Sequence, residues 1–383
     1  MSTSVSVPRL QHWDIFCRVI DNFGDIGVSW RLARQLVAEH GVQVRLWVDQ
    51  LASLQALCPS VNAGAAQQTV EGVTIFQYSN HAPFAQPGDV VIEAFGCGLP
   101  QTYKDAMASR ATKPLWIILE YLSAEPWVRE HHGLPSPHPQ LNLPRYFFFP
   151  GFTAGTGGVL REAALIARRD AFSAQARGAF WSRMGFDAVP GGATAVSLFA
   201  YARAPYAALL AACANGASPV VLAIPEGPLA AAVRHQLHCG PVDRTRMGNL
   251  EVRFVRFVPQ ADYDELLWAC DINFVRGEDS FVRAQWAGQP FIWHIYPQAE
   301  NAHQVKLDAF LQVFLANTAA AQAVRELWHA WNGVAGAPPV AEAWARFAGE
   351  RQMQMQSLRT WQDHLVSVGD LTGSLLKFCQ KMI

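Results

Sequence analysis

The sequence lacks the patterns that would place the protein in a membrane or in a disulfide-bonded, secreted class. No apolar run approaches the roughly 20 residues that a membrane-spanning helix needs. The first residues contain no apolar stretch of the kind found in signal peptides. The seven scattered cysteines form no CxxC pair and no disulfide framework. We therefore expect a cytoplasmic protein with no membrane association.

Charge and familiar catalytic motifs are also sparse. The net charge of -1 gives no basic field that would attract nucleic acid. GxSxG, Walker A and zinc patterns are missing, and neither half carries the GxGxxG that a dehydrogenase would need. His131, His132, His235 and His238 have no convergent cysteine or acid partners, so we expect no metal site. Cys97 stands between two glycines, but no nearby base supports a nucleophile there.

What the sequence does contain is a repeated strand, loop and helix rhythm. A chain of 383 residues, 51% of them hydrophobic, is long enough for two domains. Apolar strands run into glycine-containing loops in both halves, which predicts an α/β fold with doubly wound parallel sheets. By analogy we expect a GT-B arrangement, with two Rossmann-like domains facing across a cleft. The expected boundaries are 1–160 with a returning C-terminal helix at about 366–383, a linker at 161–186, and a second domain at 187–365.

The first strand and helix enclose a loop with two acids. Apolar residues predict a strand over 13–20, and the apolar spacing that follows from Val28 predicts a helix. Asp21 and Asp25 lie between them, at the carboxyl end of the strand, where ligands bind in open α/β sheets. The two acids are either turn and cap residues or a general base and its helper.

A second polar group follows a strand in the C-terminal half. The run 276–280 reads Arg-Gly-Glu-Asp-Ser, and its free backbone N–H groups at a helix start can hold a diphosphate. Arg276 would add a positive charge and Ser280 a hydroxyl, while Glu278 would accept hydrogen bonds from sugar hydroxyls. The pattern equally allows an ordinary N-cap group.

Aromatic residues at other strand ends of this half suit a nucleotide. Phe257 would stack on a base whose polar edge meets the backbone of Gln260. Phe199 and Tyr201 end an earlier strand, and the hydroxyl of Tyr296 would reach a phosphate. An alternating strand can also place such aromatics in the core, and Tyr296 can be a turn residue.

Three stretches, 13–36, 276–288 and 293–298, resemble the EarP family of bacterial protein-arginine rhamnosyltransferases, which mature elongation factor P. The resemblance spans nearly the whole chain. It implies an inverting, metal-independent GT-B enzyme that moves L-rhamnose from dTDP-β-L-rhamnose to one arginine of elongation factor P. The modified factor would relieve ribosome stalling at polyproline. The resemblance also implies an acceptor-binding N-terminal domain, a donor-binding C-terminal domain and no cofactor.

Individual roles follow from the same resemblance. Asp21, Asp25 and Glu278 match the catalytic acids, with Asp25 expected as the base and Asp21 as the residue that orients the arginine or shares charge. The residues expected to support the acceptor loop are Asn22, Phe23 and Gly24. The expected donor contacts are Phe257 and Gln260 at thymine, then Arg276, Asp279, Ser280 and Tyr296, with Phe199 or Tyr201 beside the base.

Other functions stay open on the sequence. A sugar-nucleotide epimerase, or a glycosyltransferase with a small-molecule acceptor, would use the same donor motif. An epimerase would act on dTDP-rhamnose without any acceptor protein. A non-catalytic binding protein would keep the cleft but lose the acids, whereas Asp21, Asp25 and Glu278 are all present.

Overall fold

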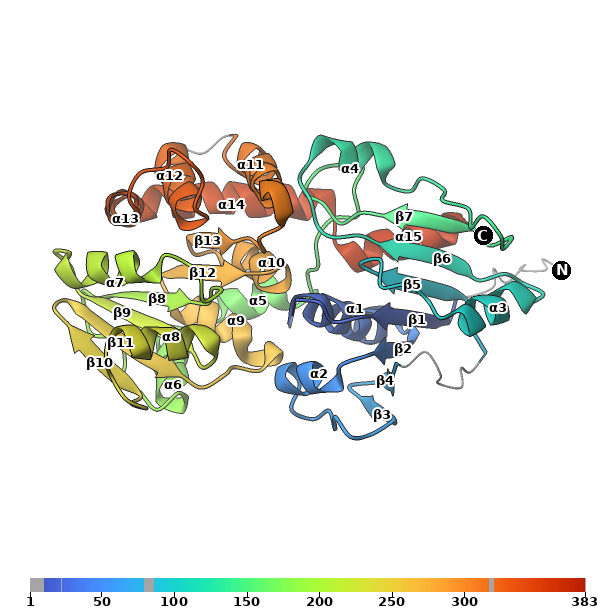
Figure 1. Ribbon diagram of the computed structural model, residues 1–383, viewed down its shortest axis with the longest axis horizontal. Coiled ribbons are helices and arrows are strands. Elements are labelled where there is room, and N and C mark those ends of the chain that lie inside the picture. Colours follow the sequence, from blue (N-terminus) through green and yellow to red (C-terminus); the bar gives the residue numbers. More distant parts are fainter. Residues whose placement is uncertain (1–9, 22, 79–85, 317–319, 383) are drawn as a thin grey trace. The chain divides into compact units, whose positions relative to one another are not determined.

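The computed structural model describes residues 10–21, 23–78, 86–316 and 320–382, and the chain divides into two compact units (Figure 1). The first unit contains Met1–Ala163 and Val368–Ile383, and the second contains Ala164–Ser367. Each unit has a largely parallel sheet with helices between its strands, so the predicted α/β class is confirmed.

Among the described residues, the first unit has a seven-stranded sheet in the order β3-β4-β2-β1-β5-β6-β7. The strands are β1 (His12–Cys17), β2 (Gln43–Val48), β3 (Gln67–Val70), β4 (Val73–Gln77), β5 (Val90–Ala94), β6 (Leu115–Leu119) and β7 (Arg145–Phe148). The β3–β4 pair is antiparallel and the other pairs are parallel. The strand order changes direction between β1 and β5, and ligands bind at such a switch point, beyond the carboxyl ends of the strands.

The helices of the first unit are α1 (Gly24–His40), α2 (Leu51–Leu57), α3 (Gln101–Ser109), α4 (Pro126–His131) and α15 (Leu371–Lys381). The last of these is contributed by the C-terminus. Its Phe378 ring meets Tyr146 and Phe148 of β7 edge-on, at 5.7 and 5.5 Å between ring centres. Thr372 of the same helix lies 3.2 Å from His40 at the end of α1. The C-terminal helix is therefore packed into the first unit.

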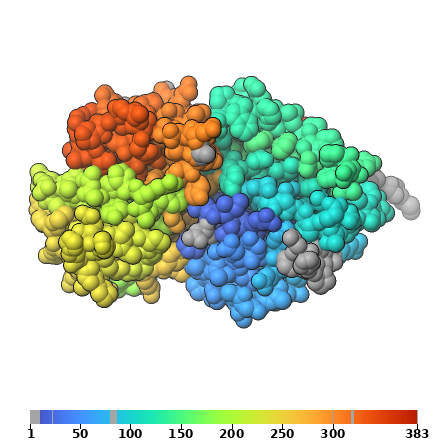
Figure 2. Space-filling model, viewed as in Figure 1, coloured from blue at the N-terminus to red at the C-terminus, as the bar shows by residue number. Residues whose placement is uncertain are grey.

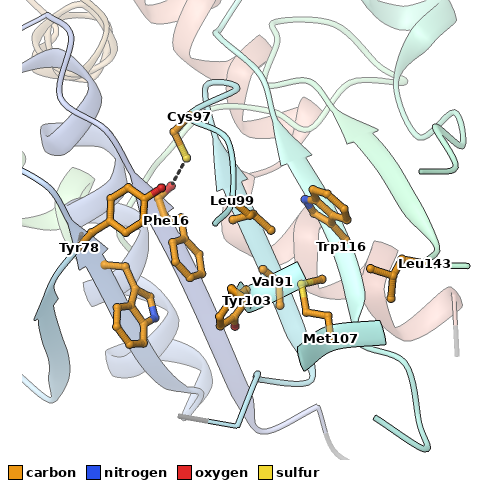
Figure 3. Packing of buried hydrophobic residues seen from close by; sticks show 10 residues of the cluster. Phe16, Tyr78, Val91, Cys97, Leu99, Tyr103, Met107, Trp116 and Leu143 are labelled. Carbon is orange, nitrogen blue, oxygen red and sulfur yellow. Dashed lines mark hydrogen bonds between the residues drawn. The ribbon is translucent and has the colours of Figure 1, made fainter. Parts of the chain in front are cut away.

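Aromatic rings fill the core beside β1 (Figure 3). Phe16 stacks on Trp47 of β2, with 5.5 Å between ring centres, and meets Tyr103 of α3 edge-on at 4.7 Å. All three side chains are almost fully buried. This packing supports β1 near the end that leads into the loop, and it ties α3 to the sheet.

A buried carboxylate lies in the same strand. Asp14 is 0% exposed and accepts two hydrogen bonds of 2.6 Å from Arg45. It also accepts from the Trp47 indole at 3.0 Å and the Tyr103 hydroxyl at 2.5 Å. These donors compensate the loss of hydration that burial of a charge entails. Burial and the Asp14 charge together raise the pKa of Tyr103 well above its ordinary value, so its hydroxyl remains a donor.

Within its described residues, the second unit has a six-stranded sheet in the order β10-β11-β9-β8-β12-β13. The strands are β8 (Thr194–Leu198), β9 (Val220–Pro225), β10 (Arg244–Met247), β11 (Leu250–Val255), β12 (Ile272–Arg276) and β13 (Phe291–His294). The β10–β11 pair is antiparallel, and the other pairs of this sheet are parallel. The order changes direction between β8 and β12, which gives this unit a switch point of its own.

The helices that begin in the second unit are α5 (Leu165–Asp170), α6 (Ala174–Arg183), α7 (Tyr206–Asn215), α8 (Pro228–Gln236), α9 (Gln260–Ala269), α10 (Asp279–Ala287), α11 (Ala302–Phe314), α12 (Ala321–Trp331), α13 (Val340–Gly349) and α14 (Arg351–Val368). In the space-filling view, the yellow segment that includes α8 and the β10–β11 hairpin forms a continuous part of the visible surface of this unit (Figure 2). Within the hairpin, β10 is the edge strand of the sheet and β11 pairs with β9.

Three local expectations differ from the structure. The first strand ends at Cys17 rather than near residue 20, because the Val19 N–H bonds to the side chain of Asp49 instead of a neighbouring strand. The short polar edge strands β3 and β10 carry no apolar run that would have revealed them. From residue 164 onward, the segment expected as a linker belongs to the second unit, and Phe180 and Trp181 of α6 are buried in its core.

Candidate active site

The loop after β1 is organised around the carboxylate of Asp25. This residue lies in the first turn of α1 and is only 2% exposed. Its Oδ2 accepts hydrogen bonds from the backbone N–H groups of Ile20 and Asp21, at 2.8 and 3.0 Å. Its Oδ1 accepts a hydrogen bond from the Tyr121 hydroxyl at 3.1 Å. Asp25 therefore folds the loop back onto the helix start and is held there in one orientation.

The loop is also fixed from the neighbouring strand. The Val19 N–H donates to Oδ1 of Asp49, which follows β2, at 2.9 Å. The side-chain amide of Gln50 donates to the Val19 carbonyl oxygen at 3.1 Å. Asp49 and Asp25 thus accept hydrogen bonds from the consecutive backbone N–H groups of residues 19–21.

The other residues predicted for this loop differ in their burial and hydrogen bonds. Asp21 is half-buried, and its carbonyl oxygen accepts from the N–H of Gly24 at 2.6 Å. A Cβ at Gly24 would lie 3.0 Å from Oδ2 of Asp21, so a side chain there would displace the carboxylate. Phe23 is half-buried and its carbonyl oxygen accepts from the Gly27 N–H at 2.9 Å. Asn22 lies outside the described residues.

Sequence reasoning did not identify Tyr121 as a residue of this site. It follows β6, whereas Asp25 follows β1, and these strands are separated in the sheet by β5. Its ring stacks on Phe95 with 4.5 Å between centres and a 20° interplanar angle. Phe95 follows β5 and adopts φ +56°, which is strained for an aromatic residue. One feature of the sequence could have identified Tyr121: both aromatic residues stand just beyond the ends of strands that lie at the switch point.

Cys97 lies in the turn after β5 and does not have the properties of a nucleophile. It is 6% exposed, and its Sγ lies 3.4 Å from the Phe16 carbonyl oxygen, as the dashed line in Figure 3 shows. Burial, aided by the charge of Glu93, raises the pKa of Cys97 to about 12. The thiol is therefore protonated at neutral pH, and nucleophilic chemistry requires the thiolate.

In the second unit, Arg276 lies close to two aromatic rings at the switch point. Its guanidinium carbon is 4.6 Å from the Phe199 ring centre and 4.7 Å from that of Tyr201. The aromatics follow β8 and the arginine ends β12, and these two strands pair directly. The structure therefore brings together three of the predicted donor residues, and both aromatics contact the same cation.

Asp279 and Gln260 form a second cluster at the start of α10. The Asp279 Oδ2 accepts from the Gln260 side-chain amide at 2.9 Å and from Nε of Arg283 at 3.0 Å. Arg283 is 3% exposed and also donates to both oxygens of Asp264, at 3.0 Å each. This chain of contacts joins α9 to α10, so Gln260 and Asp279 share one rigid support.

The remaining residues at the helix start have distinct environments. Ser280 is 7% exposed, and its hydroxyl accepts from the Arg276 N–H at 3.2 Å and donates to the Arg276 carbonyl oxygen. Glu278 is half-buried and takes the N-cap position without a side-chain capping hydrogen bond. Phe257 is half-buried beyond β11. The Ser280 hydroxyl thus closes the strand–helix turn, whose glycine, Gly277, has φ +64°.

His294 supports the aromatic part of this region. It ends β13, is 4% exposed, and its Nδ1 accepts a hydrogen bond from the Tyr201 N–H at 3.2 Å. Burial and the charges of Arg203 and Arg276 lower its pKa to about 3, so the imidazole is neutral and can accept. Tyr296 meets Tyr201 edge-on, at 5.6 Å between ring centres, and is 46% exposed.

The acids divide between the units, with Asp21 and Asp25 in the first and Glu278 in the second. Within the described ranges, no group of three His, Cys, Asp or Glu side chains has a metal-binding arrangement. In those ranges, no helix combines the length and apolar character needed to cross a membrane.

Comparison with known proteins adds to this geometry. Residues 13–380 match the family described as Elongation-Factor P (EF-P) rhamnosyltransferase EarP. The chain is 50% identical over 378 residues to a protein-arginine rhamnosyltransferase of Pseudomonas putida, covering 96% of this chain and 98% of that protein.

Two solved structures are similar to the chain. One, which addresses EarP-mediated arginine glycosylation of translation elongation factor EF-P, has a TM-score of 0.69 and 38% identity, covering 97% of this chain and 99% of that one. The other, MurG of Acinetobacter baumannii, has a TM-score of 0.51 and 12% identity, covering 97% of this chain and all of that one. MurG supports the fold alone, and the two together confirm the GT-B fold class.

Proposed function

Because the chain belongs to the EarP family of protein-arginine rhamnosyltransferases, we propose that it transfers L-rhamnose from dTDP-β-L-rhamnose to one arginine of elongation factor P. The transfer inverts the anomeric carbon and needs no metal. The modified factor relieves ribosome stalling at polyproline, and the enzyme acts in the cytoplasm. The observation that carries the proposal is the Asp25 carboxylate, held in one orientation at the switch point of the first unit.

The acceptor chemistry accounts for acids in that loop. A guanidinium is protonated at neutral pH and its lone pairs are delocalised, so it is a poor nucleophile. A carboxylate oxygen offers two acceptor sites. Both sites of Oδ2 in Asp25 are taken by backbone N–H groups, whereas Oδ1 accepts a hydrogen bond from the Tyr121 hydroxyl. We assign Oδ1 of Asp25 as the base, with Asp21 orienting the arginine or sharing charge.

The donor chemistry is assigned to the second unit. The backbone N–H groups in the first turn of α10 and the Arg276 guanidinium would stabilise the dTDP leaving group, with the Tyr296 hydroxyl as a further donor. Glu278 would accept hydrogen bonds from the sugar. The residues assigned to the base are Phe257, Gln260, Phe199 and Tyr201, while Asp279 and Ser280 are assigned to the same donor region.

The proposed step conserves atoms and charge. A guanidinium nitrogen forms a bond to C1 of rhamnose as the bond from C1 to the diphosphate oxygen breaks. The proton released by that nitrogen passes to Asp25, and the electron pair of the broken bond leaves with dTDP. Attack from the face opposite the leaving group inverts C1.

The proposal is tested by the intact mass of elongation factor P after incubation with the enzyme and dTDP-rhamnose. We expect the mass of one deoxyhexose to be added, localised to one arginine by fragmentation, and an inverted anomeric configuration by NMR. An acceptor in which that arginine is replaced by lysine is the control. Absence of transfer with folded components would contradict the proposal, and donor conversion without acceptor would favour an epimerase.

A further inference from the structure

We propose that Tyr121 is a positioning residue for the base and forms one side of the acceptor arginine site. This inference rests on the proposed function and assigns a residue to it. The hydroxyl of Tyr121 donates to Oδ1 of Asp25 at 3.1 Å, the oxygen that faces away from the two backbone donors. The hydroxyl thereby sets the direction in which Oδ1 presents its remaining acceptor site.

The hydrogen bond joins residues that follow two strands which do not pair with each other directly. Asp25 is placed by β1 and α1, and Tyr121 is placed by the end of β6. The ring of Tyr121 stacks on Phe95, which follows β5. The residue after β5 thus supports the residue after β6, and that residue donates to the carboxylate that follows β1.

Phe95 gives Tyr121 a rigid support. The Phe95 side chain is 8% exposed, and its N–H donates to the Leu119 carbonyl oxygen at 2.7 Å, which anchors it to the end of β6. Its positive φ of +56° is a conformation that an aromatic residue adopts only when its surroundings enforce it. The position of the Tyr121 ring is therefore determined by the sheet, not by the loop that carries Asp25.

Tyr121 also presents a surface to an incoming arginine. It is 38% exposed, in contrast to Asp25 at 2%. A guanidinium that bonds to Oδ1 of Asp25 lies beside the Tyr121 hydroxyl, since both groups bind the same oxygen. An aromatic ring next to a guanidinium adds a favourable cation–π contact, and this contact is stronger where water is excluded.

The two parts of the side chain have separable effects. Tyr121→Phe removes the hydroxyl and keeps the ring, so we expect kcat to fall about tenfold with the KM for elongation factor P within twofold of wild type. Tyr121→Leu removes the ring and keeps apolar bulk over Phe95, so we expect the same fall in kcat and a KM raised about tenfold. Tyr146→Phe, the same change on β7 of the same unit, is the matched control and should leave both constants unchanged.

The experiment is steady-state rhamnosylation of elongation factor P at saturating dTDP-rhamnose, with thermal unfolding and dTDP binding measured for each variant. Wild-type turnover tests the proposed function, so its absence would reject that function before Tyr121 is considered. With an active wild type, a Tyr121→Phe variant with kcat within twofold of wild type overturns the inference. Equal losses in Tyr121→Phe and Tyr146→Phe also overturn it, because they would show a merely structural effect. If Tyr121→Leu fails to fold, the Phe variant alone decides the positioning role.

Discussion

The guanidinium carbon of Arg276 lies 4.7 Å from the ring centre of Tyr201, and Phe199 lies at a similar distance from the same cation. The two aromatics and the arginine end neighbouring strands at the switch point of the second unit. Both aromatic rings therefore make cation–π contacts with the guanidinium that is assigned to the donor diphosphate.

Replacing Arg276 by lysine tests this contact. Lysine keeps the positive charge but lacks the planar guanidinium that contacts the two rings, so we expect dTDP to bind about tenfold more weakly, as measured by calorimetry. Arg246→Lys is the control, since Arg246 lies on the edge strand β10 and pairs with Glu251. Unchanged affinity in Arg276→Lys would contradict the assignment of Arg276 to the donor site.

Replacement of the two loop acids should have different effects on stability. In Asp25→Asn, an amide group replaces a carboxylate that accepts three hydrogen bonds, so we expect turnover to fall by about 10³ and the melting temperature to fall as well. Asp21 is half-buried, and Asp21→Asn should lower turnover with little change in melting temperature.

The measurements for the loop acids are initial rates and thermal unfolding in the same buffer. Asp105→Asn, an exposed change on α3 of the same unit, is the control for both quantities. If Asp25→Asn keeps turnover near that of wild type, Asp25 is not the base. A large loss of stability in Asp21→Asn would instead assign Asp21 to the structural support of the loop.

The buried Asp14 should be important for the stability of the first unit. Asp14→Asn removes the charge that Arg45 and the Tyr103 hydroxyl satisfy, and we expect the free energy of unfolding to fall by about 3 kcal/mol. Denaturant unfolding followed by tryptophan fluorescence measures this change. Glu342→Gln, which affects an exposed pair with Arg346, should change stability by no more than about 0.5 kcal/mol. Equal effects of the two changes would contradict the prediction.

The neutral state of His294 predicts a pH dependence. Burial and nearby arginines lower its folded-state pKa to about 3, whereas an unfolded histidine has a pKa near 6.5. Between these values the unfolded state binds a proton that the folded state does not, so acidification destabilises the fold by up to about 1.4 kcal/mol per pH unit. Stability from this group is present above pH 6.5 and is lost as the pH falls.

An asparagine side chain at position 294 can accept a hydrogen bond from the Tyr201 N–H, and it does not titrate between pH 3 and pH 6.5. We therefore expect His294→Asn to lose about 1–2 kcal/mol less unfolding free energy than wild type between pH 7 and pH 5. Chemical denaturation of both proteins at the two pH values measures the difference, and the contributions of the other histidines cancel in the comparison. The same loss in both proteins would show that His294 does not titrate as described.

Much of the architecture could be predicted because strand and helix patterns are local. The apolar runs that became β2, β5, β6, β9 and β12 are each followed by a turn residue and a helical segment, and the structure has them at nearly the expected positions. Edge strands such as β3 could not be predicted from the sequence. A four-residue polar segment owes its conformation to its partner strand, not to its own composition.

The predicted site residues are only partly explained by pattern. Arg276, Phe199 and Tyr201 were separate candidates in the sequence, and the pairing of β8 with β12 placed them in contact. Ser280 remains a predicted donor contact, and in the structure its hydroxyl bonds to the backbone of Arg276. Which backbone groups need a partner depends on where a strand ends, and the sequence does not specify that to the residue.

The loop between β1 and α1 has some features that the sequence determined and others that depend on the fold. Two acids four residues apart, after an apolar strand and before a helix, were enough to mark 21–25 as a candidate site, because strand, glycine and helix signals act over a few residues. That Tyr121, almost a hundred positions later, donates to Asp25 was decided by the order β1-β5-β6 in the sheet. Strand order is set by packing over the whole unit, so only the tertiary structure could bring that hydroxyl to the carboxylate.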